Sequence, residues 1–120
     1  MQRTWIALGA LAGLAAVAMA AMAAHGLEPA QQAVLHSGAE MQAWHALALL
    51  AVGLWTPRGG RLADAAGVAF ALGIGLFCGA VYAVGLFGVH LGMMAPVGGT
   101  LLMVGWLLLG ISALTARRAT

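Results

Sequence analysis

The stretch AVGLWTPRGGRLADAAGVAF, residues 51–70, places a short charged turn between two long apolar runs. The first run covers residues 41–55 and the second covers residues 62–86. Proline and paired glycines mark turns, and Asp64 suits the first turn of the helix that follows. The stretch therefore predicts two helices joined by a tight connection over residues 57–61.

The composition is that of a membrane protein. Of the 120 residues, 63% are hydrophobic and 7% are charged, whereas soluble domains carry about 25% charged residues. The length suits one domain, residues 1–120. The cations are five scattered arginines and no lysine, which excludes a nucleic-acid-binding patch. A single cysteine, Cys78, excludes an intrachain disulfide, and its apolar setting favours a small hydrophobic role.

The apolar runs predict an all-α bundle of four transmembrane helices in the lipid bilayer. About 20 apolar residues span the hydrocarbon core as a helix. The residues from 25 to 40 are more polar and predict a short extracytoplasmic surface helix, broken near Gly38. The expected elements are spans over about 5–24, 39–55, 62–86 and 96–114, with the surface helix over about 29–37.

The first apolar run has two interpretations. Arg3, the apolar stretch and Ala-Met-Ala at 18–20 or 21–23 resemble a signal peptide with its cleavage site. However, the run is as long as a true span. We therefore expect it to remain as the first transmembrane helix.

The arginines and histidines separate onto opposite sides once the spans are drawn. Positive residues near span ends favour the cytoplasm, so the sequence predicts a multi-pass protein of the bacterial inner membrane with both termini cytoplasmic. The histidine side, outside, is where chemistry is expected. The arginines are Arg3, Arg58, Arg61, Arg117 and Arg118, and the histidines are His25, His36, His45 and His90.

Small residues recur at four-residue spacing along the expected spans. Such spacing lets transmembrane helices approach closely. Two interpretations stay open: packing within one bundle, or additional contact with a second copy or another membrane protein. The expected packing residues are Gly9 and Gly13 in the first span, Gly75 and Gly79 in the third, and Pro96, Gly98 and Gly99 in the fourth.

A polar network is expected near the outer face. Its candidates are His25, Glu40, Gln42, His45 and Tyr82, which fall at similar depth; His36 and His90 are expected in loops facing water. The network could be a structural cap, a metal site, a proton-responsive site or, for His25 and His45, a haem site. Because no HxxxH or HExxH spacing occurs, we predict no metal and no cofactor.

Four motifs resemble the YgdD-like family of small, mostly bacterial inner-membrane proteins, which lack an agreed function. They are His25-Gly26-Leu27, Gln42-Ala43-Trp44-His45-Ala46-Leu47, Phe77-Cys78-Gly79-Ala80-Val81-Tyr82, and Pro96-Val97-Gly98-Gly99 followed by Gly105-Trp106. The resemblance covers essentially the whole chain and implies a four-helix membrane protein rather than an activity. The chain departs from the family pattern at Met41, Cys78 and Ala80.

No catalytic constellation accompanies these motifs. The sequence has no Ser/His/Asp spacing, no glycine-rich phosphate loop and no paired intramembrane carboxylates. We therefore expect a non-enzymatic accessory or scaffolding subunit that acts through helix–helix association. The alternative is a small transport or sensing protein with a metal- or proton-responsive histidine site on the extracytoplasmic side.

Overall fold

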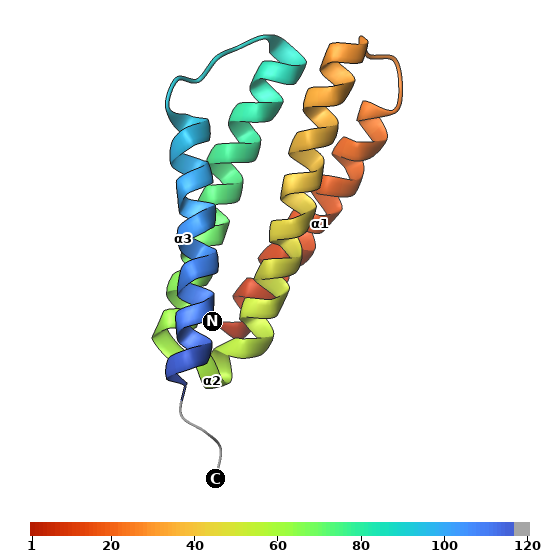
Figure 1. The fold of residues 1–120 in the computed structure, drawn as a ribbon. Coiled ribbons are helices and arrows are strands. Elements are labelled where there is room, and N and C mark those ends of the chain that lie inside the picture. The colour runs from red at the N-terminus through yellow and green to blue at the C-terminus, as the bar shows by residue number, and fades with distance from the viewer. Residues whose placement is uncertain (117–120) are drawn as a thin grey trace.

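A computed structural model describes residues 1–116 as an all-α protein of three helices: α1 (Gln2–Ala23), α2 (Pro29–Phe87) and α3 (Met94–Thr115). All three are long and apolar enough to cross a membrane. α2 folds back on itself at Gly60, so it has a first arm, residues 29–59, and a second arm, residues 61–87 (Figure 1). Arg117 and Arg118, expected on the cytoplasmic side, lie outside the described residues.

Gly60 makes the turn between the two arms. Its φ of 61° and ψ of −141° lie in a region that is essentially restricted to glycine. Pro57 lies inside the first arm and has no N–H to donate to the carbonyl of Gly53. The hydroxyl of Thr56 donates to that carbonyl instead, at 3.0 Å. The helix therefore continues through the proline, and the chain turns at the glycine.

The structure corrects the prediction of a separate surface helix over residues 29–37. These residues are the first turns of the first arm, which passes Gly38 without a break. The arm begins at Pro29, where the backbone N–H of Glu28 donates to the side-chain oxygen of Gln31 at 3.2 Å. Gly38 is buried because the Tyr82 ring packs on it, and a Cβ at Gly38 would lie 2.7 Å from Cε1 of Tyr82. This glycine makes room for a ring and does not end a helix.

The core is built from large side chains that pack on glycines of a neighbouring segment. Added Cβ atoms would come close to the packed side chains, within 2.6 Å at Gly67, where the Trp5 ring lies, and within 2.7 Å at Gly105, where the Phe70 ring lies. Trp5 and Phe70 belong to one buried cluster that joins α1, both arms and α3. Close contact of this kind stabilises helices in lipid, where hydrophobic segregation between helices is weak.

One end of the bundle holds the start of α1, the Gly60 turn and the end of α3 (Figure 1). We call it the arginine end, because the described arginines Arg3, Arg58 and Arg61 occur there. Two hydrogen bonds connect the segments at this end. The Trp5 indole donates to Oδ1 of Asp64 at 2.8 Å, and the Trp55 indole donates to Oγ of Ser112 at 2.9 Å. The opposite end, with the connections over 24–28 and 88–93, is the loop end.

Candidate functional site

Gln42 is the junction of three segments. It lies on the first arm and is 5% exposed. Its side-chain N–H donates to the carbonyl of Ala12 on α1 at 2.9 Å, and its side-chain oxygen accepts from the Tyr82 hydroxyl on the second arm at 2.6 Å. A buried amide is costly unless both of its ends are bonded. Here both ends are bonded, and each bond fixes the first arm to a different segment.

His45 lies one turn further along the first arm and has both ring nitrogens engaged. Nδ1 lies 2.6 Å from the carbonyl of Met41, and Nε2 lies 3.0 Å from the indole nitrogen of Trp106 on α3. A carbonyl only accepts and an indole N–H only donates. The proton of the neutral ring is therefore on Nδ1, and Nε2 is the acceptor. His45 has no nitrogen left for a metal ion unless one of these hydrogen bonds breaks.

The His45 ring is also part of an aromatic cluster with Phe70 and Trp106. The centroid of the His45 ring lies 5.8 Å from each of the other two. Phe70 and Trp106 meet at 5.2 Å with an interplanar angle of 76°, the edge-to-face arrangement that aromatic pairs favour. His45 thus connects the first arm to the second arm by packing and to α3 by a hydrogen bond.

The other two network candidates lie apart from this group. His25 is exposed in the connection after α1, and Glu40 is exposed on the first arm. Across residues 1–116, no three His, Cys, Asp or Glu side chains come close enough to hold a metal ion. His90 is exposed in the loop over 88–93, as expected, whereas His36 is exposed but helical. The structure therefore joins Gln42 to Tyr82, and joins His45 to a partner on α3.

Two of the expected packing residues lie at close approaches. A Cβ at Gly9 would lie 2.9 Å from the carbonyl oxygen of Ala46, and Gly98 packs directly on the backbone of Phe77. Gly13 and Gly99 make looser contacts: a Cβ at these positions would have its nearest neighbours at 3.9 Å and 3.7 Å. Pro96 is exposed in the first turn of α3.

Gly75 and Gly79 face outward on the second arm. Both are exposed, and no side-chain or tertiary neighbour among residues 1–116 lies within 4 Å of a Cβ built at either one. Cys78, between them in sequence, is buried, with Sγ 3.7 Å from the carbonyl of Gly38. The packing of the single chain does not use the outward glycine pair.

Sequence reasoning missed the partners on α3. In the sequence Trp106 belongs only to a motif, and no pattern marks Ser112. In the structure Trp106 donates to His45 and Ser112 accepts from Trp55, and these bonds hold α3 to the first arm. The available signal was the tryptophan itself, since a buried or half-buried indole N–H usually finds an acceptor. Across the described residues, every buried side-chain nitrogen and oxygen has a hydrogen-bond partner.

Comparison with known proteins gives consistent matches along the chain. Residues 19–99 match the family described as "Protein of unknown function (DUF423)". The chain is 33% identical over 122 residues to a UPF0382 membrane protein of Haemophilus influenzae, covering 98% of each. It is 35% identical over 117 residues to one of Staphylococcus epidermidis, covering 93% of this chain and 96% of the relative. No solved structure gives a significant match.

Proposed function

The chain belongs to the DUF423 family of membrane proteins, whose function is unknown, and on that premise we propose a non-enzymatic accessory or scaffolding role. In this proposal the protein acts in the bacterial inner membrane by helix–helix association, with another membrane protein or with a second copy. The finer YgdD-like assignment is also a proposal, and it rests on the four motifs of the sequence.

The observation that carries the proposal is the outward glycine pair of the second arm. Ala71, Gly75, Gly79 and Ala83 follow at four-residue spacing and form a small-residue stripe. A glycine inside a helix costs roughly 0.5–1 kcal/mol relative to alanine. Packing within the chain does not offset that cost, because the Cβ positions of both glycines are open among residues 1–116. A second helix that approached this stripe closely would offset it.

The association can be tested with a photo-cross-linking amino acid at Leu72, an exposed residue one turn from Gly75. In native membranes we expect an adduct that disappears in the Gly75→Leu/Gly79→Leu variant. Gly110→Leu is the matched control, since Gly110 is an exposed α3 glycine whose Cβ position is also open within the described residues. An adduct that survives the double substitution, or no adduct at all, would refute association through this stripe.

The proposed topology has four spans: α1, the two arms of α2, and α3. Its support is that the described arginines gather at the arginine end together with the start of α1 and the end of α3 (Figure 1). A fluorescent protein fused to the C-terminus should fluoresce in the cytoplasm. Alkaline phosphatase inserted in the loop over 88–93 should be active outside. Reversal of both signals would invert the topology and leave the association test unaffected.

A further inference from the structure

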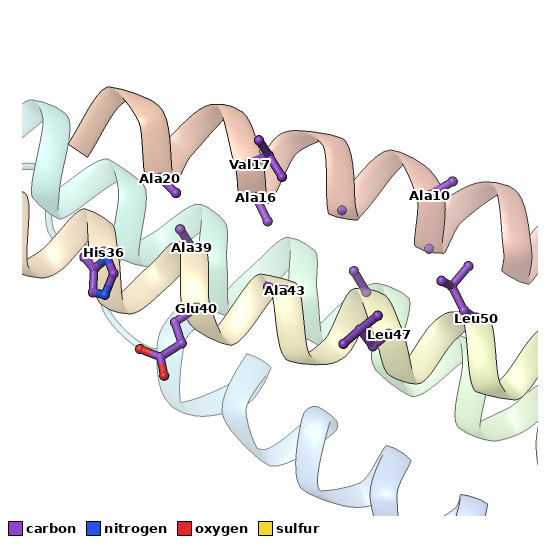
Figure 2. A pocket seen from close by; sticks show the side chains of 13 residues that line it. Ala10, Ala16, Val17, Ala20, His36, Ala39, Glu40, Ala43, Leu47 and Leu50 are labelled. Carbon is purple, nitrogen blue, oxygen red and sulfur yellow. The ribbon is translucent and has the colours of Figure 1, made fainter. Parts of the chain in front are cut away.

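A groove runs between α1 and the first arm on the outside of the bundle. Its volume is about 410 Å³, within the range of roughly 300–1,000 Å³ usual for ligand pockets. Ala10, Ala16 and Ala20 of α1 lie along one wall, opposite Ala39 and other residues of the first arm (Figure 2). Small side chains on both helices form the groove, and its open side faces the bilayer.

Two polar residues stand at one end of this otherwise apolar groove. His36 and Glu40 lie one turn apart on the first arm, toward the loop end, and both are exposed (Figure 2). The Glu40 carboxylate extends from the rim, away from α1. A second hollow continues past His36 and adds Gln32 to the polar end. Among the described residues that line either hollow, none is Arg or Lys.

Glu40 lies in the outer part of the hydrocarbon layer, below the headgroups. Glu40 precedes Trp55, at the arginine end, by 15 residues, or about 22 Å of helix. The hydrocarbon core is about 30 Å thick, so Glu40 lies roughly 8 Å inside the outer boundary if Trp55 marks the inner one. A carboxylate at that depth is costly unless it is paired. Extension of the side chain toward the loop end and local thinning of the bilayer bring such a charge toward the headgroups.

We propose that the groove holds one acyl chain of a membrane lipid whose headgroup carries a protonated amine, with the amine paired to Glu40. The apolar lining along the length of the groove suits a hydrocarbon chain. The groove opens toward the bilayer, so an acyl chain can enter it from the side. The carboxylate, with only the His36 imidazole beside it on the rim, selects a cationic group and disfavours a purely anionic headgroup. This site goes beyond the proposed association, because the small-residue stripe lies on the other arm.

The test uses the full chain in nanodiscs of phosphatidylethanolamine and phosphatidylglycerol. Each lipid in turn carries a photoactivatable diazirine on its acyl chain, and mass spectrometry locates the labelled peptides. We expect the ethanolamine lipid to label α1 and the first arm along the groove. Ala43→Phe, which fills the groove from an exposed lining position, should abolish that labelling. Ala113→Phe, at an exposed α3 position outside the groove, should leave it unchanged.

The headgroup preference is tested separately with Glu40→Gln. The variant should retain labelling in the groove but lose a preference of about two- to fivefold for the ethanolamine lipid, the size that exposed ion pairs give. Equal labelling by both lipids in the unmodified chain would overturn the amine recognition. Labelling of the groove peptides that survives Ala43→Phe would overturn the lipid site. None of these outcomes alters the cross-link at residue 72.

Discussion

The hydrogen bond from Tyr82 to Gln42 should contribute measurably to the stability of the bundle. Tyr82→Phe leaves the Gln42 side-chain oxygen without its donor, and Gln42→Leu leaves the Tyr82 hydroxyl without its acceptor. Gln42→Leu also removes the bond to Ala12 of α1. Loss of this bond costs little at the Ala12 carbonyl, because a carbonyl has two acceptor sites and this one still accepts its hydrogen bond within α1. The larger loss is therefore expected for Gln42→Leu.

The magnitudes follow from hydrogen bonds measured inside membranes, which average about 0.6 kcal/mol and reach about 1.7 kcal/mol. We expect Tyr82→Phe to lower the free energy of unfolding by about 1 kcal/mol and Gln42→Leu by about 2 kcal/mol. The double variant should cost about 1 kcal/mol less than the sum, because one shared bond is counted twice in the singles. Unfolding by dodecyl sulfate in mixed micelles, followed by circular dichroism, measures all three.

A matched cycle controls for general destabilisation. Trp55→Phe removes the bond to Ser112, 13 residues from Gln42 on the same arm, or about 20 Å away. Distant sites without shared partners add within about 0.5 kcal/mol, so Gln42→Leu and Trp55→Phe should be additive. If Gln42 and Tyr82 are additive too, the hydrogen bond makes no net contribution and the structural interpretation of the pair is wrong.

Three further predictions concern Gly67, Gly60 and His45. Gly67→Ala should destabilise the bundle by about 1–3 kcal/mol, because the new methyl meets the Trp5 ring; Gly79→Ala, measured beside it by the same titration, should be neutral or stabilising. Gly60→Ala should cost about 1–3 kcal/mol through the strained φ of the turn; an unchanged unfolding midpoint would contradict the turn geometry. Nitrogen NMR should show the His45 proton on Nδ1 with Nε2 as acceptor; a proton on Nε2 would contradict the hydrogen bond from α3.

The sequence was sufficient to predict apolar helices and a reversal of the chain within residues 57–61, but the structure keeps Pro57 helical and turns at Gly60. Length and hydropathy determine which segments can span a bilayer, and the Pro-Arg-Gly-Gly stretch marks where the chain reverses. The prediction of a surface helix is wrong, because the polar residues continue directly into the apolar helix and Gly38 does not end it. The sequence alone does not distinguish a glycine that breaks a helix from a glycine that packs beneath an aromatic ring. Only the packing of Tyr82 on Gly38 tells them apart.

The pairing of side chains was less predictable than the depth at which they lie. Depth follows from counting along each helix. The sequence predicts Gln42 and Tyr82 at a similar depth, and in the structure a hydrogen bond joins them. The rotation of a helix about its axis cannot be obtained by counting residues in the same way. α3 is apolar on almost every side, and a helix that is hydrophobic all round carries no periodic signal of its buried face. The bond between Trp106 and His45 joins residues 61 positions apart and depends on that rotation.

The glycines of this chain fall into two kinds that the sequence does not distinguish. Gly67 and Gly105 each lie beneath a ring, so any larger residue would displace part of the core. Gly75 and Gly79 have open Cβ positions within the described residues, so alanine would fit the single chain and suit its helix better. A requirement for glycine at the second pair must then come from something outside the chain that approaches the second arm closely. If leucine at Gly75 and Gly79 leaves the association intact, glycine is not required at these positions. The small-residue stripe then has no role in association.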